Sequence, residues 1–365
     1  MIIFWFLILL TVIVFVHEMG HYLIARINGV KVDVFSIGFG SEVFGWYDKL
    51  GTRWKICIIP LGGYVKFFGD ANLASSLSDK SIQKLNKKDL YKTFISKSLL
   101  QKSAIVFAGP LANFIFAIIV FFLLFMVNGV VKDVTVLNVV DNVVTGSPAY
   151  KSGFTTDDII VKIDNINTNN FSDIKEIVEK NPNNELAITI IRYGREKILL
   201  VTPELKEIVN FEGEKSYVGR IGIAPKFEIN YENIGFLASI KKAFSDTFIF
   251  TYKTFEGISE ILTGKRSASE LGGPIMIANV AGEAADNGIQ NFLFIMAIIS
   301  INLGLINLFP IPLLDGGHLF LFLIQALKGS PINENFLKYY SMLGLVILIG
   351  LMILVNYNDL FKLFN

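Results

Sequence analysis

The feature that most constrains this chain is its opening segment, where a metal-binding pattern lies inside a membrane-type helix. Residues 1–16 contain no charged side chain, and the run FVHEMGHYLIA follows at residues 15–25. About 20 apolar residues are enough for a helix to cross a ~30 Å hydrocarbon core. We predict a retained membrane helix at residues 1–27, because the segment lacks the basic start and small-residue cleavage site of a signal peptide.

Two histidines in that helix have the spacing of metal ligands. His17 and His21 are four residues apart, so both imidazoles leave one helix face and can hold one metal ion, for which Zn²⁺ fits best. Glu18 follows the first histidine, at the position of a general base that acts on water beside the metal without being a ligand. Two structural helix histidines with a snorkelling glutamate are the alternative. Ionisable groups at membrane depth, however, are rare and usually functional.

Composition favours a membrane protein and narrows the choice of metal ligands. Hydrophobic residues make up 52% of the 365 residues, which exceeds the apolar fraction of about 45–50% that is usual for a soluble domain. The mean hydropathy is +0.53. A net charge of +1 without a basic stripe gives no reason to expect nucleic acid as a partner. Cys57 is the only cysteine, so the metal must be held by histidine and carboxylate.

The pattern along the chain predicts a multi-pass α-helical membrane protein with four transmembrane helices and added β elements. Further membrane helices are expected at residues 103–128, 291–327 and 341–357. The second carries AGPLAN at residues 108–113, whose small residues permit close approach to the first helix. Residues 28–102 form the most basic connection, so the positive-inside rule places them in the cytoplasm and the N-terminus outside the cell. Their apolar β-type runs predict hairpins that dip into the membrane face, with a small sheet under the helices as the alternative.

A separate water-soluble α+β module is predicted at residues 134–205. Short β-rich runs surround one helical stretch at residues 172–179, and turns fall at GSPAYKSGF and NPNN. The pattern resembles a PDZ domain, which binds extended peptides by strand addition beside a helix; a small β domain that only fills space is the alternative. A peptide-carboxylate loop would be sought near residues 136–140. Residues 206–290 are expected to form a linker and amphipathic helices, chiefly at 233–262 on the outer membrane surface.

The third metal ligand is expected at the end of the third membrane helix. The apolar pattern breaks at FPIP, residues 309–312, and LLDGGH follows with Asp315 at membrane depth. An acid placed there needs a partner, and a hydrolytic zinc site usually takes three protein ligands. Asp315 is therefore the preferred third ligand, and His318 is its competitor. Both helices run inward with these residues late in them, so the site falls in the cytoplasmic half of the bilayer.

Taken together, these motifs resemble the site-2 protease family of intramembrane zinc metalloproteases, in its RseP-type (regulator of sigma-E protease) bacterial group. The resemblance extends nearly end to end, through HEMGH, GFG, PLGGYVKF, AGPLAN, LGGPIMIA and INLGLINLFPIPLLDGGH. It implies zinc bound by His17, His21 and Asp315, with Glu18 as the catalytic base. It also implies a substrate-binding set made of Asn307 and a membrane-associated β element containing Gly62, Gly63, Tyr64 and Val65. Better-known members carry two tandem PDZ modules, and this chain has room for one.

The expected activity is that of a metalloendopeptidase of the bacterial inner membrane, which hydrolyses peptide bonds within transmembrane segments of membrane-protein substrates. The resemblance implies regulated intramembrane proteolysis, for example of anti-sigma factors or remnant signal peptides. It adds the lipid bilayer and an upstream site-1 protease as partners, and an extracytoplasmic PDZ-like domain. One alternative is a prenyl-protein type membrane protease, whose third ligand is a glutamate or histidine. The other is a non-proteolytic membrane adaptor with a structural zinc site, which would need no base at Glu18.

Overall fold

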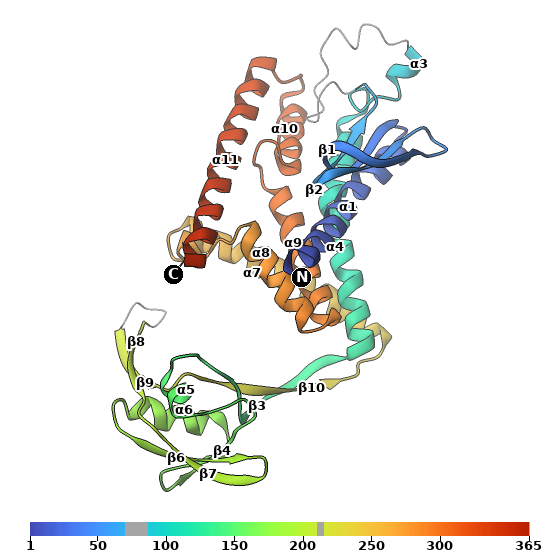
Figure 1. Cartoon of the computed structure of the whole chain (residues 1–365). Coiled ribbons are helices and arrows are strands. Elements are labelled where there is room, and N and C mark those ends of the chain that lie inside the picture. Colours follow the sequence, from blue (N-terminus) through green and yellow to red (C-terminus); the bar gives the residue numbers. More distant parts are fainter. Residues whose placement is uncertain (70–86, 210–214, 365) are drawn as a thin grey trace. The chain divides into compact units, whose positions relative to one another are not determined.

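Four long apolar helices form the framework of one of two compact units. The structure, a computed structural model, describes residues 1–69, 87–209 and 215–364. One unit comprises Met1–Val127 and Ile234–Asn365, and the second comprises Asn128–Asn233. In the first unit, the described residues include four helices long and apolar enough to cross a membrane: α1 (Ile2–Ile27), α4 (Leu99–Asn128), α9 (Ile289–Leu308) and α11 (Glu334–Phe364) (Figure 1). The chain is therefore organised as a membrane protein with β elements.

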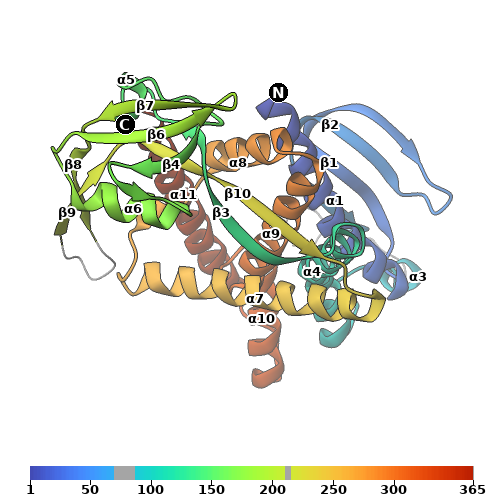
Figure 2. The same ribbon diagram turned by 90° about the horizontal axis from the view of Figure 1, so that it is seen from below.

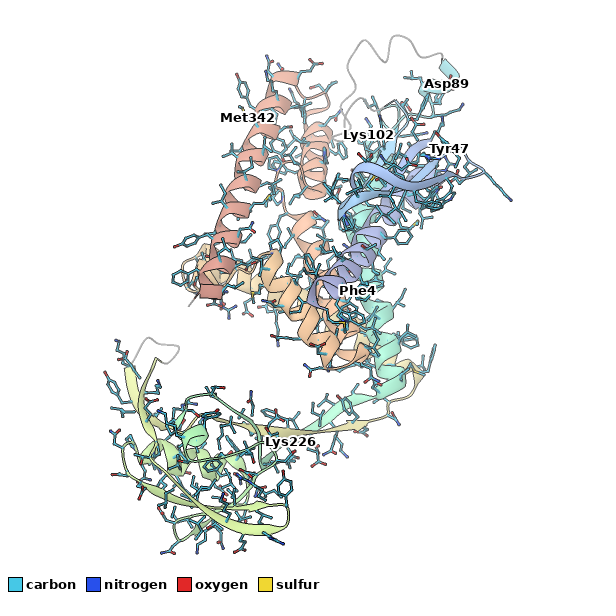
Figure 3. The ribbon with its side chains drawn as sticks, in the orientation of Figure 1. Phe4, Tyr47, Asp89, Lys102, Lys226 and Met342 are labelled. Atoms are coloured by element: carbon cyan, nitrogen blue, oxygen red, sulfur yellow. The ribbon has the colours of Figure 1, made fainter. Side chains whose placement is uncertain are left out.

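The third membrane segment contains a break, and the fourth membrane helix is longer than expected. Within 291–327 the chain breaks at the FPIP run: α9 ends at Leu308, and α10 (Asp315–Lys328) begins after a turn that contains both prolines. Helix α11 begins before residue 341 and continues beyond 357, since hydropathy marks the lipid-facing part of a helix and misses its polar ends. Along α11 apolar side chains such as Met342 are exposed (Figure 3). Such exposure is expected of a surface that faces lipid.

Helix α7 (Phe236–Leu262) lies crosswise to α4, which is viewed nearly end-on in Figure 2. Its buried positions are small or hydroxylated, and Thr254 Oγ1 donates a 2.8 Å hydrogen bond to Asn302 Oδ1 on α9. Its other face exposes Phe244 and Phe248. The short helices η1 (Ala268–Glu270) and α8 (Pro274–Asp286) follow. At the start of α8, the Asp359 carboxylate of α11 accepts three backbone N–H groups at 2.8, 2.9 and 3.1 Å.

A small sheet packs against α1 in the part of the chain expected to be cytoplasmic. It consists of β1 (Val32–Tyr47) and β2 (Arg53–Phe67), which are antiparallel. The first half of β1 lies between two parts of β2: residues 63–67 pair with it on one side, and residues 53–56 pair with it on the other. Phe35, fully buried, anchors the sheet to the α1–α4 core. Residues 70–86 of this loop lie outside the described residues, and the short helix α3 (Lys87–Leu90) follows them.

The second unit is a β-sheet with one helix packed against it. Its sheet has the order β10-β3-β4-β6-β7, with β5 paired to β4, and β8 and β9 form a separate pair. The strands are β3 (Val130–Val143), β4 (Ile159–Ile163), β5 (Ile166–Asn167), β6 (Leu186–Arg192), β7 (Arg195–Val201), β8 (Glu204–Val209), β9 (Lys215–Arg220) and β10 (Ile223–Glu232). The helices are α5 (Pro148–Lys151) and α6 (Phe171–Lys180). The module is thus longer than the expected 134–205, because β10 pairs with β3 and brings part of the expected linker into the sheet.

Two features of the second unit depend on particular side chains. Helix α6 starts with a capping box formed by Asn170 and Asp173. Asp158 is fully buried and accepts hydrogen bonds from the Arg192 guanidinium at 2.6 and 2.7 Å.

A groove runs beside α6 and is lined on its other side by residues 219–223. A peptide site beside the helix would therefore use these residues, whereas residues 136–140 lie within β3, which pairs with β10 and β4.

Candidate active site

The opening helix presents the first two candidate ligands to the interior of the helical unit. His17 and His21 lie one turn apart on α1, and their Nε2 atoms are 3.2 Å apart. His17 is 8% exposed, so its ring is almost fully buried within the protein. Nδ1 of His21 lies 2.9 Å from the carbonyl oxygen of Ile105 on α4. Because a carbonyl can only accept a hydrogen bond, this contact places the proton of His21 on Nδ1 and leaves the Nε2 lone pair free for a metal.

Small residues allow α4 to come close enough for that contact. A Cβ on Gly20 of α1 would lie 2.2 Å from the carbonyl oxygen of Ala108, and a Cβ on Gly109 would lie 2.3 Å from Nε2 of His21. The His21 ring therefore rests directly on the α4 backbone at a glycine. The AGPLAN run thus shapes the site as well as permitting close approach of the two helices.

The third candidate ligand comes from the turn between α9 and α10. Asp315 is the first residue of α10, and its neighbours Gly316 and Gly317 leave no room for a Cβ, which would approach carbonyl oxygens of residues 308, 309 and 311 within 2.2–2.3 Å. Leu313, two residues before the aspartate, has φ +74°, a left-handed conformation that is strained for a branched side chain. The tight turn thereby brings a carboxylate from the far end of the chain to α1.

The three ligand atoms have the spacing of a metal site. Oδ2 of Asp315 lies 3.2 Å from Nε2 of His17 and 3.5 Å from Nε2 of His21. A tetrahedral zinc with bonds of ~2.0–2.1 Å places its ligand atoms about 3.3–3.4 Å apart. Within the described residues, that same buried Oδ2 has no hydrogen-bond partner. The donor set, its spacing and the orphaned oxygen all fit Zn²⁺, with a position left for water or substrate.

A cavity of about 280 Å³ opens onto these atoms. Glu18 lines it, and its carboxyl faces the backbone N–H of Val65. Of the other expected site residues, the cavity brings in Asn307, Gly63, Tyr64 and Val65, but not Gly62. Gly62 lies at the bend of β2, with φ +93°, where a Cβ would approach the Phe39 ring. His318 lines the cavity but does not belong to the ligand cluster found among the described residues.

Two histidines and a carboxylate around one point, with a glutamate beside them and apolar helices around them, define a metallohydrolase centre in a membrane protein. The model of "Peptidase family M50" matches residues 5–351. The chain therefore belongs to peptidase family M50, the site-2 protease family.

Curated relatives match the chain almost from end to end. It is 38% identical to "Putative zinc metalloprotease R01501" of Rhizobium meliloti (strain 1021), over 99% of this chain and 96% of the relative. It is 39% identical to "Putative zinc metalloprotease RC0203" of Rickettsia conorii, over 99% and 98%. "Metalloprotease MmpA" of Caulobacter vibrioides is 34% identical, over 97% and 94%. The protein is a membrane-embedded zinc metalloprotease, which sets aside the non-proteolytic adaptor.

Proposed function

We propose that this protein hydrolyses peptide bonds within transmembrane segments of other membrane proteins. The observation that carries the proposal is the position of the cluster of His17, His21 and Asp315, which opens into a cavity lined by residues of α1, α4, α9 and α10. Both histidines lie in the second half of a helix long enough to span a bilayer. A bond cut at this centre would therefore lie at membrane depth.

In this proposal His17, His21 and Asp315 hold the ion. Bound there, Zn²⁺ supplies a Lewis acid for the scissile carbonyl and makes water acidic enough to attack near neutral pH. Glu18 takes the proton from the attacking water and later donates it to the leaving amine. The tight packing around His21 and the turn at Asp315 keep the donor atoms fixed, so little reorganisation accompanies the reaction.

The substrate segment would bind as an added strand. A helix hides its carbonyls in internal hydrogen bonds and must unwind before it can be cut. Residues 63–65 of β2 pair with β1 on one side, and no described strand pairs on their other side, which lies along the cavity. That edge can accept the unwound backbone. Asn307, which also lines the cavity, is proposed to hold the substrate backbone near the scissile bond.

The remaining proposals concern location and partners. The basic connection after α1 supports a cytoplasmic position for β1 and β2, an extracytoplasmic N-terminus and a site in the inner leaflet of a bacterial inner membrane. The second unit then lies outside the cytoplasm. Its sheet, helix α6 and the groove beside α6 support a PDZ-like module. Such a module suits substrates already shortened by an upstream site-1 protease, as in regulated intramembrane proteolysis.

The experiment compares purified full-length protein and its Glu18→Gln variant, reconstituted with a single-span substrate protein. Glu18→Gln is expected to bind zinc as the native chain does and to give no cleavage. Glu42→Gln, at an ion pair with Arg53 in the β1–β2 sheet, serves as the control and should cleave normally. Cleavage by Glu18→Gln at the native rate, or cleavage only outside the substrate's membrane span, would refute the proposal.

A further inference from the structure

A buried amide lies behind the first candidate zinc ligand. Asn113 on α4 is fully buried, and its Nδ2 lies 3.3 Å from Nδ1 of His17. Among the described residues its Oδ1 has no hydrogen-bond partner. A buried amide in an apolar bundle is expected to satisfy its polar atoms. The arrangement around Asn113 therefore needs an explanation.

The contact between the Asn113 amide and Nδ1 of His17 is explained by the tautomer that a metal requires. Nε2 of His17 is the atom that converges with His21 and Asp315, at 3.2 Å from each partner atom. A neutral imidazole that offers the Nε2 lone pair to zinc carries its proton on Nδ1. Nδ1–H is then a buried donor that needs an acceptor. Within residues 1–69, 87–209 and 215–364, the side chain placed in hydrogen-bonding range of it is that of Asn113.

The two orientations of the Asn113 amide have opposite effects on zinc binding. An NH₂ group that faces Nδ1 donates to the Nδ1 lone pair, which puts the imidazole proton on Nε2 and blocks the metal. An oxygen that faces Nδ1 accepts its proton and frees Nε2. The oxygen and nitrogen of an amide are assigned from their hydrogen bonds, because their shapes are nearly identical. Exchanging them gives His17 its acceptor without moving any other group.

We propose that Asn113 is a positioning residue for the zinc centre: its Oδ1 accepts the Nδ1–H of His17 and holds this histidine in the metal-binding tautomer. The inference rests on the proposed role of His17 as a ligand. His21 has the same need and meets it with the carbonyl oxygen of Ile105 at 2.9 Å. Both orienting acceptors thus come from α4, eight residues apart along one helix face.

Helix packing does not account for the Asn113 side chain. The contact between α4 and α9 uses the Asn113 backbone, because Ser300 Oγ donates to its carbonyl oxygen at 3.1 Å. Close approach of the two helices is provided by Gly304, where a Cβ would lie 3.1 Å from the carbonyl oxygen of Pro110 and 3.3 Å from Cβ of Asn113. The amide itself is directed at His17. Its removal should therefore affect the metal more than the fold.

The test measures zinc affinity of purified full-length protein in detergent, by competition with a chelator, together with thermal unfolding of the metal-free form. Asn113→Leu keeps the approximate volume and removes the acceptor, and it should weaken zinc binding about 10- to 100-fold. Asn113→Asp retains an oxygen at that position in either protonation state and should keep affinity near the native value. Asn302→Leu, which loses the hydrogen bond from Thr254 in the same bundle, is the matched control and should leave zinc affinity unchanged.

The outcomes separate this inference from the proposed ligand set. Native zinc affinity in Asn113→Leu, or equal weakening in Asn113→Leu and Asn113→Asp, would overturn the inference. If Asn113→Leu does not fold, Asn113→Ala takes its place, since it removes the acceptor without adding bulk. His17→Ala is measured in parallel: if its zinc affinity is native, the ligand role of His17 is wrong. If only His17→Ala weakens zinc, Asn113 alone is wrongly assigned.

Discussion

Substituting Gly109 by alanine tests whether the α4 backbone sets the position of His21. A Cβ at residue 109 would lie 2.3 Å from Nε2, 2.5 Å from Cε1 and 2.9 Å from Cδ2 of the His21 ring. Non-bonded carbon and nitrogen atoms rest about 3.5 Å apart, so the ring must retreat by about 1 Å. Metal–ligand distances tolerate only about 0.2 Å. The methyl group and a correctly placed zinc are therefore incompatible without movement of the helix.

The size of the effect follows from overpacking. Inserting a methyl group into a filled interior costs about 1–3 kcal/mol. The His21 ring is held on its other nitrogen by the Ile105 carbonyl at 2.9 Å, so it has little freedom to move away. If the cost falls on the metal-bound state, Gly109→Ala should weaken zinc binding about 5- to 150-fold, at about 1.4 kcal/mol for each factor of ten.

The assay is chelator competition on the purified protein, with thermal unfolding of the metal-free form and proteolysis of a single-span substrate measured in parallel. Gly350→Ala is the matched control, because this glycine lies in α11 and a Cβ there would meet nothing within 4 Å. Alanine at that position should leave zinc affinity unchanged and stabilise the helix by about 0.5–1 kcal/mol. Zinc affinity of Gly109→Ala within twofold of native would show that the contact does not position the ligand.

Three further predictions concern stability. Burial alone would raise the pKa of Asp158, but hydrogen bonds from the Arg192 guanidinium and the Thr155 N–H more than offset burial and lower the pKa. The second unit should therefore lose stability as the pH falls through about 4 and below. Amide exchange of β4 and β6 in the full chain measures this loss, and Asp158→Asn should flatten its pH dependence. Asp359→Ala should destabilise the helical unit by about 2 kcal/mol, because three backbone N–H groups at the start of α8 lose a charged acceptor; an unchanged unfolding temperature would contradict this. Leu313→Gly should raise the unfolding temperature, because relief of the positive φ is worth about 1–3 kcal/mol and exceeds the conformational-entropy cost of glycine, about 1 kcal/mol. Leu313→Val should lower the unfolding temperature.

Short-range features of the fold and site could be predicted from the sequence. Hydropathy locates the four long helices, and the HEMGH spacing places His17 and His21 on one helix face whatever surrounds them. An acid at membrane depth needs a partner, and this requirement indicates Asp315 as the third ligand. The structure places its Oδ2 within 3.2–3.5 Å of both imidazoles. Each of these inferences depends on local periodicity or on one strong energetic requirement.

Features that depend on long-range pairing could not be read in the same way. The sheet of the second unit is completed by β10, which pairs with β3, and no local pattern shows that two distant segments are neighbours. The contact between Asn113 and His17 joins residues 96 apart in the chain. The positive φ of Leu313 results from a turn whose glycines pack on carbonyl oxygens, although leucine itself gives no sign of such a conformation.

The division of the metal cluster between α1 and the start of α10 has a consequence for biosynthesis. Ribosomes deliver the N-terminal helix to the membrane first, whereas Asp315 leaves the exit tunnel only when most of the chain has been made. A growing polypeptide that contains only α1 and α4 has two of the three proposed zinc ligands, His17 and His21, and lacks Asp315. We therefore expect unfinished chains, and truncated products that end before α10, to have no peptidase activity.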